Sequence, residues 1–455
     1  MRKAFLHYPK GIVVSCQDFM KSVSKILIRA MVLPMTGPDV FYPQGEIAIE
    51  NDRIVSVGAL GSVPAGFNPD RILELPNDVV MPGLINTHTH AAMTLLRSYA
   101  DDLPLMPWLN EKVWPFEDKL TEEDIYWGTA LALCEMIRSG TTTMLDMYAS
   151  MDQVAEAVLS AGTRAVLSRG LIGNGPNGQR ALEENIDLVQ RYHGTGNGRV
   201  SIMFGPHAPY TCSAEYLRNV KAEADRLGVG IHIHVAETKD EIKIIQEQYG
   251  KTPVQWLDEL GLFGGHVVAA HCVHLTPEDM DILASRHVCV AHNAESNMKL
   301  SSGTAPIIEL RAKGVVIGLG TDGASSNNNL DLFGEMRSAT FQQKLRVNST
   351  VLPAYEVLEM ATVSGAQTLG LKDVGMLAPG FKADIISIDM DQPHFYPRFS
   401  IPAHLVYVAH AGDVRTVMVD GKLLMEERKL LTMEVGKVCQ EAETRAKRIS
   451  AELNS

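Results

Sequence analysis

Residues 82–90, PGLINTHTH, set the pattern that decides the fold. A short apolar run opens with proline and glycine and ends in two histidines, as expected of a buried strand that delivers polar side chains at its end. Seven further runs of the same build follow, at 141–148, 164–172, 200–211, 229–238, 266–275, 287–297 and 314–323. Nearly all of them finish in histidine, aspartate, arginine or asparagine. The sequence therefore predicts eight buried strands.

Amphipathic stretches with helix-capping signals separate most of these runs. Thr121 and the acidic residues after it form a capping-box pattern, and Gly140 closes that stretch. Residues 213–228 and the stretch opened by Thr276-Pro277 are read in the same way. Eight strands alternating with helices predict a parallel α/β fold, a (β/α)₈ TIM-type barrel. An open doubly wound sheet is the alternative, but polar residues at the carboxyl end of nearly every run favour the barrel.

The two flanks of the chain have another pattern. Residues 26–80 and 373–434 contain alternating strands with turn signals, which indicate antiparallel β-structure. We expect them to form one small β-domain beside a catalytic barrel of residues 81–372. Residues 1–25 are expected to be an N-terminal extension, and residues 435–455 a C-terminal helix.

The composition limits the classes of function. A chain of 455 residues exceeds the size of a single core, which favours two domains. The net charge of −13 argues against nucleic acid or an acidic membrane surface as a partner. No apolar run approaches the roughly 18 residues of a membrane span, and the opening residues lack a signal-peptide core. Six cysteines without a C-x-x-C pair suggest reduced thiols and a cytoplasmic protein.

Histidines and one aspartate mark the ends of several predicted strands. In a strand, residues i and i+2 share a face, so the imidazoles of His88 and His90 can point at one ion. The other strand-end residues are His232, His234, His271 and Asp322. Taken singly, each histidine could be a hydrogen-bonded residue of the core, and Asp322 could be an ordinary turn residue. Their coincidence at strand ends predicts a site for zinc or a similar divalent ion, whose task would be to make a water molecule acidic.

Glu237 follows His234 by three residues in the stretch HVAET. That spacing suits a proton shuttle beside the ion. The alternative is a loop glutamate that pairs with Lys239.

Taken together, these motifs resemble the amidohydrolase superfamily. The resemblance rests on PGLINTHTH, HIHVAET, AAHCVHL, HNAESNMKLSSGTAP and GLGTDGASSNNNLD, and it covers about residues 25–435. It implies that the β-domain is a split β-sandwich. The long segment of residues 90–128 is similar to the 5-methylthioadenosine/S-adenosylhomocysteine deaminase family. One departure is Ala294, where the superfamily usually has proline.

The resemblance implies hydrolytic deamination of the adenine ring of 5'-methylthioadenosine and/or S-adenosylhomocysteine, or of adenosine. The products would be the inosine analogue and ammonia. One metal ion, Zn²⁺ or alternatively Fe²⁺ or Mn²⁺, would be bound by His88, His90, His234 and Asp322. Metal-bound hydroxide would attack the ring while Asp322 takes the water's proton, His271 steadies the water and Glu237 moves protons to the ring nitrogen and the ammonia. The predicted third and fourth strands hold no lysine, which favours the single-metal branch over the two-metal one.

Five residues match family positions near the substrate. Trp108 would offer a flat wall and Glu117 would accept hydrogen bonds from ribose hydroxyls. His207 would line the pocket, and Arg169 with Arg180 would hold the amino-acid carboxylate of S-adenosylhomocysteine. For each of the five, packing, structural support or simple solvation is the alternative reading.

Two competing functions stay open. Another member of the superfamily would share the metal site but act on guanine, cytosine or a triazine; Trp108 with Glu117 favours a ribosylated purine instead. A non-catalytic scaffold is the remote alternative, since the chain keeps every expected metal ligand. Enzymes of this group commonly self-associate, so we expect a homo-oligomer.

Overall fold

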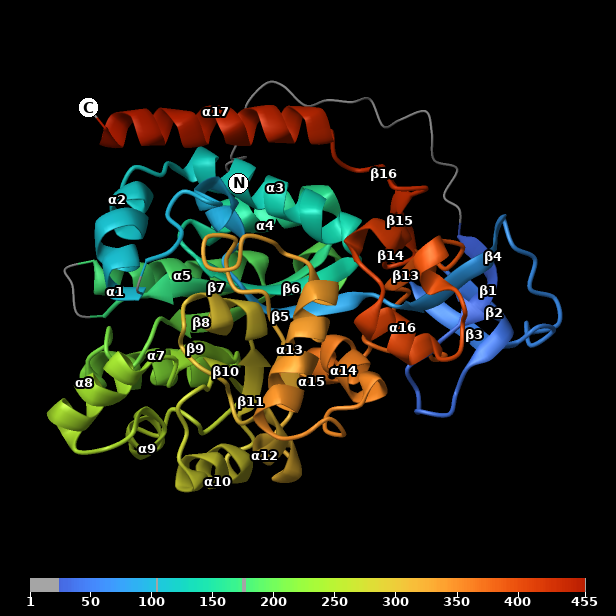
Figure 1. Cartoon of the computed structure of the whole chain (residues 1–455). Coiled ribbons are helices and arrows are strands. Elements are labelled where there is room, and N and C mark those ends of the chain that lie inside the picture. The colour runs from blue at the N-terminus through green and yellow to red at the C-terminus, as the bar shows by residue number, and fades with distance from the viewer. Residues whose placement is uncertain (1–23, 104, 174–176, 455) are drawn as a thin grey trace.

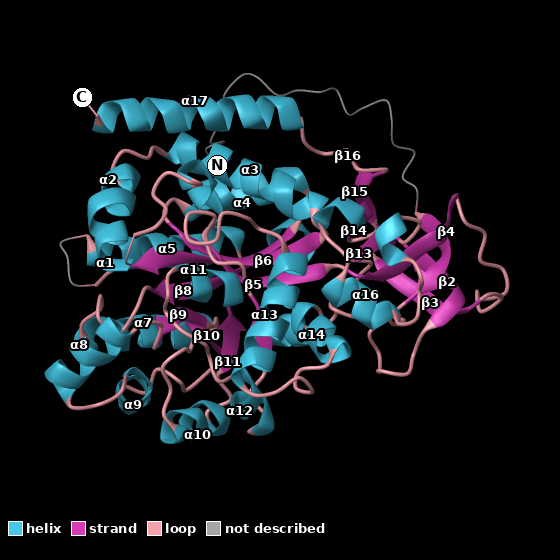
Figure 2. Ribbon diagram, in the orientation of Figure 1, coloured by secondary structure: helices cyan, strands magenta, loops and turns pink. Residues whose placement is uncertain are grey.

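The computed structural model describes residues 24–103, 105–173 and 177–454 (Figure 1). The predicted N-terminal extension lies, up to residue 23, outside the described residues. Two groups of strands organise the molecule: one is surrounded by helices and the other lies to its side (Figure 2).

The first group is the predicted barrel. Its eight strands are hydrogen-bonded in chain order and all their pairings are parallel. They are β5 (Leu84–Thr89), β6 (Thr141–Tyr148), β7 (Arg164–Leu171), β8 (Val200–Pro206), β9 (Ile231–Val235), β10 (Val267–His271), β11 (Cys289–His292) and β12 (Ile317–Leu319). Each lies within one of the eight apolar runs of the sequence, so the barrel prediction is confirmed.

Hydrogen bonds close the barrel between its first strand and the residues that follow its last strand. The Asn86 side-chain amide on β5 donates to Thr321 Oγ1 at 2.7 Å, and the Thr321 N–H donates back to Asn86 Oδ1 at 3.1 Å. The Asp322 N–H also donates to the His88 carbonyl at 3.0 Å. These bonds set the first histidine motif beside Asp322, although the two are far apart in sequence.

Helices surround the barrel. The three whose caps the sequence marked are present as α3 (Glu122–Arg138), α7 (Ala214–Leu227) and α10 (Pro277–Ser285), and Thr121 and Thr276 both form complete capping boxes. Between β5 and α3 the chain forms η1 (Ala91–Leu96), α1 (Leu105–Trp108), η2 (Leu109–Val113) and α2 (Trp114–Glu117). The remaining helices are α4 (Met151–Ala161), α5 (Gly178–Tyr192), α6 (Thr195–Gly198), α8 (Lys239–Tyr249), α9 (Pro253–Glu259), α11 (Ala294–Lys299), α12 (Ile307–Ala312), α13 (Leu332–Arg346), α14 (Ala354–Ala361), α15 (Val363–Thr368), η3 (Pro393–Phe395), α16 (Ile401–Tyr407), η4 (Ala411–Asp413) and α17 (Val435–Leu453).

The second group of strands joins both flanks of the chain in one sheet, in the order β16-β15-β14-β13-β4-β1-β2-β3. Its strands are β1 (Lys25–Val32), β2 (Tyr42–Glu50), β3 (Arg53–Ala59), β4 (Arg71–Pro82), β13 (Ile385–Asp389), β14 (Val414–Val419), β15 (Lys422–Glu426) and β16 (Lys429–Leu430). The flanks meet where β13 pairs antiparallel with β4, and Figure 1 shows the blue and red strands side by side. One pairing departs from the expected antiparallel arrangement: β1 and β4 are parallel.

A single glycine links the two sheets. β4 ends at Pro82 and β5 begins at Leu84, so only Gly83 separates them. A Cβ atom at this position would lie 2.2 Å from the Thr142 side chain on β6. Glycine therefore lets the chain pass from the sheet into the barrel without displacing β6.

The C-terminal helix α17 lies along α3 (Figure 1). Arg448 and Arg445 on α17 reach the buried carboxylate of Asp124, at 2.6 and 3.2 Å. In the described parts of the chain, each helix is too short or too polar to cross a membrane.

Candidate functional site

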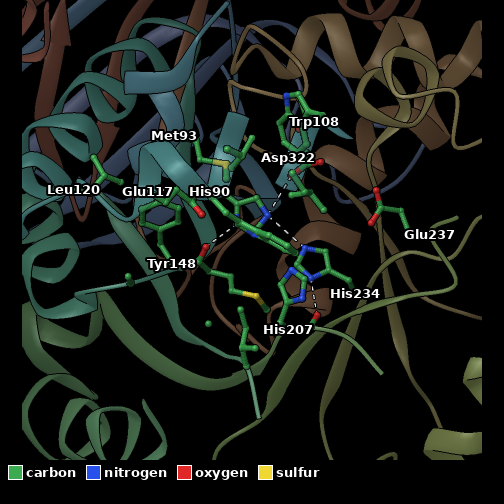
Figure 3. A pocket seen from close by; sticks show the side chains of 18 of the residues that line it. His90, Met93, Trp108, Glu117, Leu120, Tyr148, His207, His234, Glu237 and Asp322 are labelled. Carbon is green, nitrogen blue, oxygen red and sulfur yellow. Dashed lines mark hydrogen bonds and ion pairs between the residues drawn. The ribbon is translucent and has the colours of Figure 1, made fainter. Parts of the chain in front are cut away.

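The metal ligands predicted from the sequence lie together at the carboxyl end of the barrel. His88 is the last but one residue of β5 and His90 lies just beyond that strand, His234 lies on β9, and Asp322 follows β12. Asp322 Oδ1 lies 3.3 Å from His90 Nε2 and 3.5 Å from His88 Nε2. His234 Nε2 lies 3.4 Å from His90 Nε2. In Figure 3, His90, His234 and Asp322 point toward one another.

In each of the three imidazoles, the other ring nitrogen, Nδ1, contacts a group outside this cluster. His90 Nδ1–H donates to the Met147 carbonyl at 2.6 Å, and His234 Nδ1–H donates to the His207 carbonyl at 2.7 Å. Each Nε2 lone pair therefore faces the cluster. His88 Nε2 is buried and has no hydrogen-bond partner in the described structure. Three imidazole nitrogens and one carboxylate oxygen, with one nitrogen otherwise orphaned, fit a divalent cation.

The backbone turns sharply at the ends of the strands that carry the candidate catalytic residues. Asp322 has a φ of 61°, His271 of 73° and Ala236 of 53°, values that non-glycine residues rarely adopt. Glu241 secures one of these turns, since its carboxylate accepts the Ala236 N–H at 2.8 Å and the Glu237 N–H at 2.9 Å. The strain aims Glu237, His271 and Asp322 into the same space.

Glu237 and His271 face each other across the site. Glu237 Oε2 lies 3.9 Å from His271 Nε2, and His271 Nδ1–H donates to Asn297 Oδ1 at 2.8 Å. Burial raises the pKa of the Glu237 carboxyl, although the nearby His271 opposes the shift. The other oxygen of Asp322, Oδ2, accepts a hydrogen bond from the Ser296 hydroxyl at 2.6 Å.

A cavity of about 330 Å³ opens above the cluster, a size suited to a small organic ligand. Four of the five predicted substrate residues line it: Trp108, Glu117, Arg169 and His207. Trp108, which is 5% exposed, borders the cavity together with Met93 and Tyr148 (Figure 3). The walls are therefore largely apolar, with the acids and histidines confined to a few points.

Glu117 lines the cavity but is not one of the predicted metal ligands. The Tyr148 hydroxyl donates to Glu117 Oε1 at 2.7 Å, and among the described residues no hydrogen bond is formed by the other carboxylate oxygen. Burial raises the pKa of Glu117, while the Tyr148 hydrogen bond acts in the opposite direction. Elsewhere in the cavity, burial lowers the pKa of His207 to about 4, so its ring is neutral at physiological pH.

Arg169 and Arg180 are placed differently from each other. Arg169 lines both the main cavity and a second, more polar one, whereas Arg180 lines only the second. The Arg180 side chain is 81% exposed. Glu184 joins them: its Oε2 accepts from Arg169 Nε at 3.0 Å and its Oε1 from Arg180 Nε at 2.9 Å.

Several residues of the site escaped the sequence reasoning. His232, one of the predicted strand-end histidines but outside the ligand set that the resemblance implied, contacts His88 Nδ1 through its Nε2 at 2.8 Å. Tyr148, Ser168, Ser296 and Asn297 were not singled out, because single polar residues at strand ends or on a short helix carry no spacing signal. The motif HNAESN contained two of them, but nothing in it distinguished those that face the site.

A second group of possible ligands lies outside the barrel, formed by His394, His410 and Asp413. Asp413 Oδ2 accepts the His410 backbone N–H at 3.0 Å and lies 3.2 Å from His394 Nε2. The Gly412 N–H donates to His410 Nδ1 at 3.2 Å. These contacts are those of a helix cap at η4, which explains the group without an ion.

Comparison with known proteins identifies the family. The model of the amidohydrolase family matches residues 79–424, which include the whole barrel and all the predicted metal ligands. The chain belongs to the amidohydrolase family. The resemblance read from the sequence motifs is therefore confirmed, and a divalent metal ion is part of the site.

The relatives refine this assignment. A 5-methylthioadenosine/S-adenosylhomocysteine deaminase of Desulfitobacterium hafniense (strain Y51) is 78% identical over 428 residues, covering 94% of this chain and 99% of that protein. A 5'-deoxyadenosine deaminase of Methanosarcina mazei is 48% identical, over 94% of this chain and 99% of its own length. Among solved structures, an adenosine deaminase from Xanthomonas campestris with bound zinc has a TM-score of 0.90 at 34% identity, covering 94% of this chain and 98% of that one.

Proposed function

We propose that this protein is a zinc-dependent hydrolase that deaminates the adenine ring of 5'-methylthioadenosine and/or S-adenosylhomocysteine, giving the inosine analogue and ammonia. The observation that carries the proposal is the convergence of three imidazole Nε2 atoms and Asp322 beneath a cavity that also holds Glu237 and Glu117. The names of the relatives support the choice of an adenine nucleoside.

His88, His90, His234 and Asp322 would hold the ion. When bound, it supplies Lewis-acid chemistry that lowers the pKa of a water molecule towards about 7. His271, fixed by Asn297, faces the same space and would orient the attacking water by a hydrogen bond. Zinc suits a set of three imidazoles and one carboxylate.

Two carboxylates would share the proton transfers. Asp322 would take a proton from the attacking water as the new C–O bond forms at C6 of the ring. Glu237 would protonate the adjacent ring nitrogen and later help deliver a proton to the departing amino group, so that the C–N bond breaks and ammonia leaves. The raised pKa of Glu237 favours the protonated form that its first transfer requires.

The rest of the cavity would select the nucleoside. Trp108 gives the base or sugar a flat apolar wall, and the other carboxylate oxygen of Glu117 would accept a hydrogen bond from a ribose hydroxyl. A free base offers no hydroxyl to Glu117, which argues against guanine or cytosine as the substrate. Arg169 would reach the amino-acid end of S-adenosylhomocysteine, with Arg180 acting from the second cavity.

Adenosine and 5'-deoxyadenosine are the second candidate substrates. The zinc-containing structural relative is an adenosine deaminase, and the Methanosarcina relative is a 5'-deoxyadenosine deaminase. Both nucleosides present the same ring and sugar to Glu237 and Glu117. They lack the thioether chain that would run toward Arg169.

The test is ammonia release from the zinc-loaded enzyme with a panel of S-adenosylhomocysteine, 5'-methylthioadenosine, 5'-deoxyadenosine, adenosine, adenine, guanine and cytosine. We expect turnover of the thio-nucleosides and a loss of roughly 10²–10⁴-fold in kcat for Glu237→Gln, the range for a general acid–base group. The matched control is Glu247→Gln on α8, an exposed carboxylate whose loss should leave kcat unchanged.

Metal analysis of the same proteins separates the two parts of the proposal. Glu237 is outside the predicted ligand set, so Glu237→Gln should retain the ion. Turnover of guanine or cytosine without any adenine nucleoside would leave the metal site standing and refute the substrate assignment. A Glu237→Gln variant as active as the wild type would refute the proton shuttle.

A further inference from the structure

A buried chain of hydrogen bonds lies behind His88. His88 Nδ1 lies 2.8 Å from His232 Nε2, His232 Nδ1 lies 3.0 Å from Ser168 Oγ, and Ser168 Oγ lies 3.0 Å from the Asp146 carbonyl oxygen. The side chains come from β5, β9 and β7, and all three residues are 0% exposed. The chain thus crosses the barrel interior away from solvent.

The backbone carbonyl at its end fixes the direction of every bond. A carbonyl oxygen only accepts, so the Ser168 hydroxyl must donate to Asp146, and its oxygen then accepts from His232 Nδ1–H. Among the described residues no carboxylate lies within ion-pair distance of the His232 ring, so this buried ring is neutral and its Nε2 is an acceptor. His88 must then carry its proton on Nδ1, which leaves the Nε2 lone pair facing the metal cluster.

The other two predicted imidazole ligands reach the same state by a shorter route. His90 and His234 donate their Nδ1–H directly to backbone carbonyls. His88 has no carbonyl at that position, and the acceptor lies two side chains farther away. The pair His232 and Ser168 therefore stands in for the missing carbonyl.

We propose that His232 and Ser168 are positioning residues that set the tautomer of His88 and thereby the affinity of the site for its ion. This inference rests on the metal site of the proposed function. Polar partners behind a metal-bound histidine typically change metal affinity by 10- to 100-fold when they are removed.

Three substitutions separate tautomer control from packing. His232→Leu removes the acceptor for His88 Nδ1–H. His232→Gln keeps the volume and returns a carbonyl oxygen near the position of the ring Nε2. Ser168→Ala lets His232 move its proton to Nε2, which would force the proton of His88 onto the nitrogen that faces the cluster.

The experiment measures Zn²⁺ affinity of each full-length variant by competition with a chelator, and the visible absorption of the Co²⁺-loaded proteins. We expect affinity to fall at least tenfold in His232→Leu and Ser168→Ala and to recover in His232→Gln, with an altered Co²⁺ spectrum in the first two. Ser139→Ala is the matched control, because Ser139 is also buried and donates to a backbone carbonyl, that of Met136.

The outcomes discriminate between the two proposals. If the wild type binds one Zn²⁺ and both His232→Leu and Ser168→Ala bind it equally well, the inference is overturned and the metal site stands. Equal loss in His232→Gln and His232→Leu, with Ser168→Ala unaffected, shows a packing role and also overturns it. If the wild type takes up no stoichiometric Zn²⁺, the metal site and the inference fail together. Thermal unfolding of the metal-free proteins confirms that each variant is folded.

Discussion

At the scale of single residues, Glu184 occupies the place where a substrate carboxylate is expected. Each of its two oxygens accepts a hydrogen bond from a different arginine, Arg169 or Arg180. An amino-acid carboxylate arriving through the main cavity would have to compete with Glu184 for Arg169. A substrate without a carboxylate, such as 5'-methylthioadenosine, meets no such competition.

We therefore predict that Glu184→Gln lowers KM for S-adenosylhomocysteine and leaves the kinetics of 5'-methylthioadenosine unchanged. The expected change is roughly two- to fivefold, since a partly exposed ion pair is worth at most about 1 kcal/mol. Steady-state kinetics with both substrates measure it. Glu183→Gln, which removes the neighbouring exposed carboxylate that pairs with Gln179, is the control. An equal change in KM for the two substrates would contradict the competition.

At the scale of elements, one buried carboxylate docks the C-terminal helix. Asp124 completes the capping box of α3 with Thr121 and also binds Arg445 and Arg448 of α17. Burial alone would raise the pKa of Asp124, but the hydrogen bonds from Thr121 and the two arginines outweigh it and lower the pKa below its ordinary value of 3.8. The ionised form is thus favoured in the folded protein.

Asp124→Asn should release α17 from α3 while the barrel stays folded. Charged hydrogen bonds of this kind contribute about 2 kcal/mol, so hydrogen exchange of the α17 amides should accelerate roughly tenfold or more. Because the folded pKa is depressed, the stabilisation is present above pH 3.8 and is lost as the pH falls through the lower folded value. At acidic pH, the α17 amides of the wild type should therefore exchange at rates that approach those of Asp124→Asn measured at the same pH.

The control for this experiment is Glu443→Gln, which removes an exposed carboxylate paired with Lys447 on the same helix. It should leave the exchange of α17 unchanged. Exchange rates in Asp124→Asn equal to those of the control would show that apolar packing alone holds α17.

At the scale of the whole molecule, a buried ion network joins the barrel to the second sheet. Arg164 at the start of β7 donates to both oxygens of Asp384, at 2.9 and 3.2 Å, and to Asp420 at 2.6 Å. Asp384 precedes β13 and Asp420 follows β14. Arg164 and the two carboxylates are almost fully buried, so the carboxylates need cations beside them. Arg164 neutralises Asp384, and Lys382 and Arg199 also lie near Asp420, at 3.5 and 3.9 Å.

Arg164→Met should destabilise the protein by about 3–5 kcal/mol, because it leaves the buried carboxylate of Asp384 without its cation and removes the nearest of the cations around Asp420. The midpoint of thermal unfolding at a fixed scan rate, with zinc present, measures the loss. Arg191→Met is the control, since Arg191 forms an exposed pair with Asp187 on one helix and should change stability by less than about 0.5 kcal/mol. A loss as small as that of the control would show that the sheets are held together by apolar contacts.

Much of the architecture follows from local patterns in the sequence. The eight apolar runs are the eight barrel strands, because burial on both faces of a parallel strand requires a short continuous apolar segment. Thr121 and Thr276 begin helices because their hydroxyls satisfy free N–H groups within the same turn. The sharing of one face by His88 and His90 likewise depends only on the alternation of side chains along a strand. The parallel pairing of β1 with β4 was missed, because strand direction depends on partners far along the chain.

The sequence by itself determined the fold class, the family and the set of candidate ligands, since these depend on residue type, spacing and order. Only the tertiary structure decided which groups meet: Arg180 turns to a second cavity, Glu184 lies between the two arginines, and Ser168 on β7 contacts His232 on β9. The physical reason is that a hydrogen bond between side chains on different strands depends on register and barrel closure, which no local pattern records.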